Sequence, residues 1–174
     1  MDLAFSQEYE TFRTQVREFL KTHGDSSPPP FARGKTDEDG KLWQQLLIEN
    51  GYAARTIPKN YGGYGAEPDI LKSHIIAEEF AKAGVRTGHS GDNRLVPTVL
   101  ELGTEEQKQW LIPPTVRGEM TWCQGYSEPG SGSDLASLTT KAVVDGDDFV
   151  INGQKIWTSG AQYADMIFCL VRTE

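Results

Sequence analysis

The chain has 174 residues, of which 37% are hydrophobic and 24% charged, a composition typical of a globular protein rather than a disordered or fibrous one. Its 17 Lys and Arg residues against 25 Asp and Glu residues give a net charge of -8 at pH 7, which disfavours a nucleic-acid surface or binding to an anionic membrane. The N-terminal segment resembles neither a signal peptide nor a transit peptide, and no apolar run is long enough to span a membrane, so we expect a cytoplasmic protein.

The first half of the sequence carries helical periodicity. Residues 5–20 place apolar side chains at steps of three and four, which predicts an amphipathic helix. A second helix is predicted to start at Thr36, with Asp39 as its capping-box partner. The dipeptide Asn50-Gly51 marks the end of this second helix.

Three further helices are predicted before residue 115. One runs from about residue 69 to residue 83, and a shorter one covers residues 96–102. The next opens at Thr104, with Gln107 in the reciprocal capping position, and is expected to end at the pair Pro113-Pro114. No strand pattern interrupts these segments, so residues 1–118 are predicted to form an all-helical domain.

The second half has short β-rich runs separated by turn residues. Asp145-Gly146 and Asn152-Gly153 each stand between two such runs, and both dipeptides favour tight hairpins. The sequence therefore predicts an α+β fold, in which residues 119–174 form the first part of an antiparallel β domain. About five short strands are too few to close a barrel. We expect that this domain is incomplete here, either because the chain is truncated or because another chain completes the sheet.

The two cysteines, Cys123 and Cys169, lie in apolar runs without metal-ligand spacing. They are expected to be buried thiols in a reducing compartment, and no metal site is predicted.

A glycine-rich segment, "GYSEPGSGSDLAS", occupies residues 125–137. A flexible linker is one reading of such a composition. The segment lies between two predicted strands, however, and its glycines and serine hydroxyls suit the close approach of an anionic or carbonyl-bearing ligand. It does not fit a Rossmann loop, because no helix follows and the third glycine of that motif is missing.

This segment also resembles the signature of the acyl-CoA dehydrogenase family, in which Ser or Thr is followed by Glu-Pro and then by Gly-Ser-Asp. Other segments match in chain order, from residue 5 to residue 172; they are "IPKNYGGYG", "AEEFAKAG", "LGTEEQKQWLIP" and "INGQKIWTSGAQYAD". Tyr126 departs from the family pattern, because many members carry a smaller aliphatic residue there.

The resemblance implies an enzyme that binds FAD between its helical and β domains and oxidises an acyl-CoA thioester to the 2,3-enoyl-CoA. In the family a carboxylate removes the α-proton while the β-hydrogen leaves as hydride to the flavin. The segment 124–133 would line the flavin and the thioester, with Ser133 also holding part of CoA. The implied FAD-binding residues are Gln124, Tyr126, Ser127, Ser133, Trp157, Thr158 and Ser159.

Two acidic residues of the segment have a simpler interpretation. Glu128 and Asp134 are expected to tie the loop to neighbouring backbone N–H groups rather than to act in catalysis. Trp157, considered without the family, would be a sheet-core residue. With the family motif, it is predicted to lie flat beside the flavin.

The helical domain contains a polar stretch, residues 88–97. One interpretation is a solvated helix start capped by Ser90 or Asp92. The other places His89 or Arg94 in the substrate cavity, where they would favour an acyl group with a polar, carboxylated or ring-bearing end.

The family's catalytic glutamate resides in a C-terminal helical domain that these residues do not include. We therefore assign no catalytic residue, and expect the 174-residue chain alone to be inactive. The implied partners are the acyl-CoA substrate, an electron-transfer flavoprotein or similar acceptor, and further subunits of a homo- or hetero-oligomer. The alternatives are a non-catalytic acyl-CoA- and FAD-binding subunit, and an acyl-CoA oxidase or flavin monooxygenase of the same fold.

Overall fold

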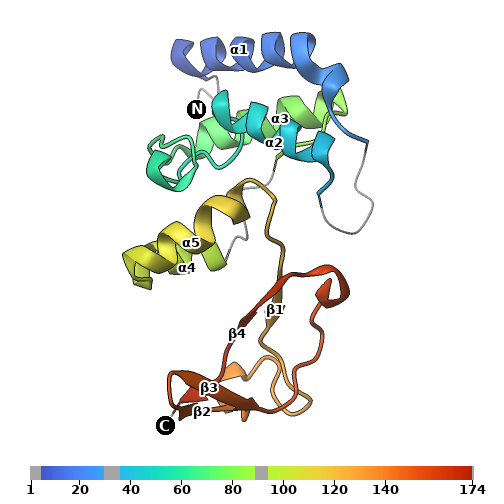
Figure 1. The fold of residues 1–174 in the computed structure, drawn as a ribbon. Helices are drawn as coiled ribbons and strands as arrows, with labels where there is room; N and C mark the ends of the chain where they lie inside the picture. The colour runs from blue at the N-terminus through green and yellow to red at the C-terminus, as the bar shows by residue number, and fades with distance from the viewer. Residues whose placement is uncertain (1–4, 30–35, 89–93, 174) are drawn as a thin grey trace. The chain divides into compact units, whose positions relative to one another are not determined.

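The computed structural model describes residues 5–29, 36–88 and 94–173 (Figure 1). They divide into two compact units, with the boundary between Glu119 and Met120. A helical unit followed by a small β unit confirms the predicted α+β class. The helices are α1 (Gln7–His23), α2 (Glu38–Glu49), α3 (Ile70–Ala83), α4 (Leu95–Leu102) and α5 (Glu105–Val116).

The predicted helix ends are largely confirmed. At α5, the Thr104 hydroxyl accepts from the Gln107 backbone N–H at 3.2 Å, while the Gln107 side chain accepts from Thr104 N–H at 2.9 Å. The start of α2 was predicted one residue too early. Its N-cap is Asp37, whose carboxylate accepts from Gly40 N–H at 2.8 Å, because a carboxylate at this position also interacts favourably with the helix dipole.

The predicted end of α5 was wrong. The helix continues through Pro113 and Pro114 to Val116. Each proline lacks the N–H donor of an intrahelical bond, but its fixed φ is close to the helical value, so the chain can keep the helical path. The Thr115 hydroxyl donates to the Leu111 carbonyl at 2.6 Å within this last turn.

The core of the helical unit is formed by α1, α2 and α3. Phe19 of α1 and Phe80 of α3 stack with their ring centroids 6.3 Å apart, and α1 packs along α3. Burial of each such side chain contributes about 1.5–3 kcal/mol to folding. The buried cluster consists of Val16, Phe19, Leu20, Trp43, Leu47, Ala53, Ile75, Ile76 and Phe80.

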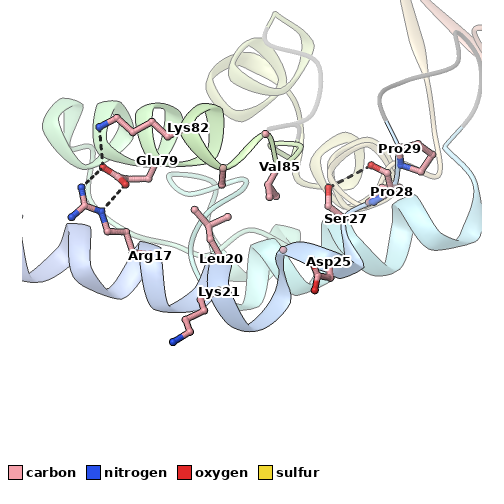
Figure 2. Close-up of a pocket in the computed structure, with 13 residues that line it drawn as sticks. Arg17, Leu20, Lys21, Asp25, Ser27, Pro28, Pro29, Glu79, Lys82 and Val85 are labelled. Atoms are coloured by element: carbon pink, nitrogen blue, oxygen red, sulfur yellow. Dashed lines mark hydrogen bonds and ion pairs between the residues drawn. The ribbon is translucent and has the colours of Figure 1, made fainter.

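A charged cluster joins the same two helices. Glu79 of α3, whose side chain is 4% exposed, accepts from Arg13 and from Nε of Arg17 at 2.7 Å. Figure 2 shows Arg17 and Lys82 reaching the same Glu79 carboxylate. These residues line a groove of about 610 Å³. Arg17, followed by Arg13, lowers the Glu79 pKa to about 2. Arg17 and Lys82 both bond Glu79 within the protein. We therefore interpret the groove as a consequence of the packing of α1 on α3 rather than as a ligand site.

The β unit contains two small sheets. The strands are β1 (Trp122–Gly125), β2 (Lys141–Asp145), β3 (Asp148–Asn152), β4 (Met166–Cys169) and β5 (Arg172–Thr173). One sheet pairs β1 with β4, and the other has the order β3-β2-β5. Asp145 pairs with Asp148 across a two-residue turn in which Gly146 has φ +65°, so the first predicted hairpin is confirmed.

Two details of the predicted β domain need correction. The unit is mixed rather than purely antiparallel, because β1–β4 and β2–β5 are parallel pairs; both join strands separated by long connections, which is how parallel pairs arise. Asn152-Gly153 does not form a second hairpin, since residues 153–158 contain no strand. A Cβ at Gly153 would lie 2.3 Å from the Thr140 hydroxyl, so the glycine permits a close approach there.

The hairpin β2–β3 is apolar yet largely exposed. Its side chains at Val143, Val144, Phe149, Val150 and Ile151 are 47–65% accessible. Within the described residues, this hairpin therefore has no layer packed on it. Among the same residues, every helix is too short or too polar to traverse a bilayer.

Candidate functional site

The structure brings the two predicted flavin-contact segments together. The backbone N–H of Ile156 donates to the Ser127 carbonyl at 2.9 Å. Next to it, the Lys155 ammonium donates to the Tyr126 carbonyl at 3.0 Å. Residues 126–128 and 155–157 thus lie side by side, although about thirty positions separate them in the sequence.

The glycine-rich segment is an ordered turn rather than a slack linker. Glu128 and Ser131 exchange two backbone hydrogen bonds, of 2.7 and 3.0 Å, across Pro129-Gly130. Ser131 is 3% exposed, and its hydroxyl donates to the Asp134 carbonyl at 2.8 Å. These bonds fix the loop at its centre.

Glu128 is buried beneath this turn, with 4% exposure. One carboxylate oxygen accepts from the N–H and hydroxyl of Thr139 at 2.7 and 2.8 Å. The other accepts from Thr140 N–H at 2.9 Å and from Lys155 at 2.8 Å. Lys155 is the main cause that lowers the Glu128 pKa far below its ordinary value. The expectation that Glu128 ties the loop to backbone N–H groups is confirmed.

Asp134 contributes to the loop through its main chain. Its carbonyl accepts from the hydroxyls of Ser131 and Ser137, both at 2.8 Å. The expected side-chain tie at Asp134 is wrong, because its side chain makes no cap hydrogen bond at the short turn Leu135–Ser137 that follows.

Lys155 was not among the residues predicted for the site. Its side chain is 9% exposed and bonds both Tyr126 and Glu128. The sequence did carry a signal, because Lys155 lies two positions before Trp157 in the segment that resembles the family motif. A lysine in a polar stretch is usually solvated, and only the contact with Glu128 identifies this one as buried.

Trp157 is 86% exposed, so the alternative of a sheet-core residue is wrong for the described chain. Its φ of +57° lies in the left-handed region, which costs a bulky residue about 1–2 kcal/mol. Such conformations persist where neighbouring bonds determine them, and they concentrate at functional sites. On its C-terminal side, Ser159 N–H donates to the Trp157 carbonyl at 2.9 Å.

The remaining predicted residues belong to the same β unit. Gln124 pairs with Phe168 across β1 and β4, and the Tyr126 ring lies 5.9 Å from the Phe168 ring. Ser133 and Ser159 are exposed, whereas Thr158 is half-buried.

Of the predicted substrate residues, Arg94 belongs to the helical unit and Ser133 to the β unit. Arg94 is exposed at the N-cap position of α4, and its carbonyl accepts from the Thr98 hydroxyl at 2.7 Å. His89, Ser90 and Asp92 lie outside the described residues.

Exposed groups of the β unit fit the chemistry of a flavin nucleotide. Trp157 offers an exposed aromatic face, and Ser133 and Ser159 offer exposed hydroxyls. A Cβ added at Gly130 or Gly132 would meet nothing within 4 Å, so the backbone there is open to a phosphate or a ring edge. The described residues contain no group of three or more His, Cys, Asp or Glu side chains arranged to hold a metal ion.

Comparison with known proteins identifies similar sequences over both units. Residues 6–119 match the acyl-CoA dehydrogenase N-terminal domain, and residues 123–174 match the acyl-CoA dehydrogenase middle domain. The chain is 39% identical to acyl-CoA dehydrogenase IpdE1 of Mycobacterium tuberculosis, over 97% of this chain and 46% of that protein. It is 35% identical to acyl-CoA dehydrogenase FadE26 of the same organism, over 99% of this chain and 44% of that protein.

Solved structures give the same result. The ChsE4-ChsE5 complex from Mycobacterium tuberculosis matches with a TM-score of 0.73 and 35% identity, over 100% of this chain and 45% of that chain. The Tcur3481-Tcur3483 steroid ACAD matches with a TM-score of 0.71 and 35% identity, over the same shares. The chain thus spans about half the length of the relatives it matches.

Proposed function

Because the chain belongs to the acyl-CoA dehydrogenase family, we propose that the complete protein oxidises an acyl-CoA thioester to the 2,3-enoyl-CoA with FAD as cofactor. The observation that carries the proposal is the junction of Ser127 with Ile156, which holds an exposed Trp157 beside an ordered glycine-rich turn. The catalytic base is proposed to come from the part of the protein beyond these residues.

In this proposal, the residues of the β unit position the cofactor and the thioester. When bound, FAD would supply the acceptor for the two electrons removed from the acyl chain. Trp157 would cover an aromatic face and exclude water, while Ser127, Thr158, Ser159 and the Tyr126 backbone would offer hydrogen bonds to the polar ring edge. Gln124 would line the same pocket. Ser133 would bind the cofactor or the pantetheine-pyrophosphate part of CoA.

The proposed substrate carries an acyl group with a polar, carboxylated or ring-bearing end. Support comes from the polar stretch around Arg94, which is exposed at the start of α4. Further support is that one similar structure is described as a steroid ACAD. His89 is proposed to act with Arg94.

Replacing Arg94 with leucine is expected to shift kcat/KM toward straight-chain acyl-CoAs, because the apolar side chain no longer favours a polar acyl end. The ratio of kcat/KM for a ring-bearing and a straight-chain acyl-CoA measures this shift. Arg86→Leu, on the coil after α3, is the matched control. An unchanged ratio in Arg94→Leu would contradict the proposed substrate contact.

The proposal also includes the setting in which the protein works. We propose a cytoplasmic enzyme of acyl-CoA degradation that transfers electrons to an electron-transfer flavoprotein or a similar acceptor. A homo- or hetero-oligomer is proposed, and the solved complex of two Mycobacterium tuberculosis proteins, ChsE4-ChsE5, supports the second form by analogy. The 174-residue chain alone is expected to form no enoyl-CoA.

Anaerobic addition of acyl-CoA to the complete protein tests the reaction. The flavin absorption bands are expected to bleach, and enoyl-CoA is expected to form in equal amount. Bound FAD that stays oxidised with a panel of acyl-CoAs would instead favour a non-catalytic binding subunit. Rapid reoxidation of the bleached protein by air would favour an oxidase or flavin monooxygenase.

A further inference from the structure

The buried contact between Glu128 and Lys155 lies beneath the proposed flavin surface and has no assigned role. Its two side chains are 4% and 9% exposed, and their charged atoms are 2.8 Å apart. Three chain segments that are distant in sequence meet around this pair. They are residues 126–128, 139–140 and 155–156.

We propose that Glu128 and Lys155 are positioning residues that lock the two flavin-contact segments in register and hold Trp157 in its strained, exposed conformation. We refer to this pair as the Glu128–Lys155 latch. The inference rests on the proposed function, because the surface that the latch supports is the one assigned to FAD.

The hydrogen bonds explain why this pair is more than a charge pair. Each Glu128 oxygen accepts two bonds, and three of the four donors belong to Thr139 and Thr140. The fourth donor is Lys155, which also bonds the Tyr126 carbonyl. A carboxylate is required at position 128, since an ammonium group there has no lone pair with which to accept from the two backbone N–H groups.

The latch acts on Trp157 through the backbone. Lys155 fixes the chain two residues before the tryptophan, and Ile156 N–H fixes it one residue before through the Ser127 carbonyl. The left-handed φ at Trp157 needs such restraint, because a free chain relaxes to a negative φ. Without Lys155, the bond from Ile156 N–H to the Ser127 carbonyl would have to restrain the segment before Trp157 without the support of the bonds to Tyr126 and Glu128.

The energetics favour positioning over stability as the role of the latch. A buried ion pair often contributes little net stability relative to an apolar pair of similar volume, because desolvation offsets the attraction. Removing only one charge leaves the other buried and unpaired, which is costly. Removing both charges is therefore expected to leave the fold intact while loosening the loop.

The test uses the complete protein with Lys155→Met, Glu128→Gln/Lys155→Met and the charge swap Glu128→Lys/Lys155→Glu. Arg172→Met is the matched control, because Arg172 bonds the carbonyls of Ala136 and Leu138 but neither latch residue. Far-UV circular dichroism verifies folding, and titration of the cofactor-free protein gives the FAD dissociation constant.

If the latch positions the loop, Lys155→Met and the double variant are expected to raise the FAD dissociation constant about tenfold or more. A change of this size corresponds to the loss of one charge-assisted hydrogen bond. The visible circular dichroism of any flavin that remains bound is expected to change. The charge swap is expected to give no rescue, and Arg172→Met to bind FAD as the wild type does. Folded variants with a wild-type dissociation constant and spectrum, or rescue by the swap, would overturn the proposal.

A cofactor-free measurement separates this inference from the proposed function. Subtracting the near-UV circular dichroism spectrum of Trp157→Phe isolates the Trp157 signal in each background. The latch predicts that Lys155→Met reduces this signal, whereas an unchanged signal contradicts it. A wild-type protein that binds no FAD would overturn the proposed function, and the Trp157 signal would still decide whether the latch holds that residue.

Discussion

The helical unit and the β unit are each stabilised internally by a different kind of interaction. The helical unit has one apolar cluster whose most buried members are at most 1% exposed; they are Val16, Leu47, Ile75 and Phe80. In the β unit, the apolar side chains of β2 and β3 are largely exposed, and the order resides in the polar contacts around Glu128. The comparison indicates that the helical unit is stabilised by its own apolar core, whereas the β unit is ordered mainly by polar contacts around the loop that we propose to face the cofactor.

The largest expected effect is at Phe80. Phe80→Ala is expected to reduce the free energy of unfolding by about 4 kcal/mol, because it leaves a cavity in a core that cannot collapse fully. Urea unfolding followed by far-UV circular dichroism measures the loss. Leu102→Ala, at a residue 77% exposed in the same unit, is the control and is expected to change the value by less than about 0.5 kcal/mol. A loss at Phe80 as small as that of the control would contradict the stabilisation of the helical unit by its own apolar core.

A somewhat smaller effect is expected at Glu79. Glu79→Gln is expected to cost about 3 kcal/mol at neutral pH, since it leaves Arg13 buried without one of its carboxylate partners. Arg13 is itself 7% exposed. Thermal unfolding at pH 7 measures the loss, and Glu18→Gln on the exposed face of α1 is the control.

The pH dependence of the same variant gives an independent measurement. The Glu79 pKa is lowered from 4.5 to about 2 in the folded protein, so its stabilising contribution is complete above pH 4.5 and is lost as the pH falls toward 2. Glu78 has a pKa lowered to about 2 as well, chiefly by Lys82, and continues to titrate in the variant. Glu79→Gln is therefore expected to reduce the dependence of stability on pH between 4.5 and 2, and an unchanged dependence would contradict the assignment.

The smallest effect is expected on the exposed hairpin. Val144→Thr, at a side chain 65% exposed, is expected to change the stability of this 174-residue chain by less than about 0.5 kcal/mol, because threonine keeps the β-branched shape and little burial is lost. The buried Ala142 of the same strand provides the contrast, and Ala142→Thr is expected to be more destabilising. Equal effects at the two positions would mean that the hairpin is covered when the chain is in solution.

The features that were predictable from the sequence are those set by local chemistry. The capping box at Thr104 and the turn at Asp145-Gly146 involve neighbours in the chain, and both were predicted and confirmed. The parallel pairing of β1 with β4 was missed, because it depends on segments about forty residues apart. The low exposure of the Lys155 side chain was missed for the same reason, because it depends on a contact with Glu128, which is distant in sequence. The prediction that Trp157 lies beside the flavin rests on the family motif, because a tryptophan considered without the motif would more often be a sheet-core residue.

Hydrogen–deuterium exchange of the complete protein, with and without FAD, tests whether the cofactor is bound by the turn around Glu128 together with the segment around Trp157. We expect slower exchange on FAD addition in peptides that cover residues 124–133 and 155–160, with no change in the interior of α1. Slower exchange elsewhere in the protein, with these two segments unaffected, would contradict it.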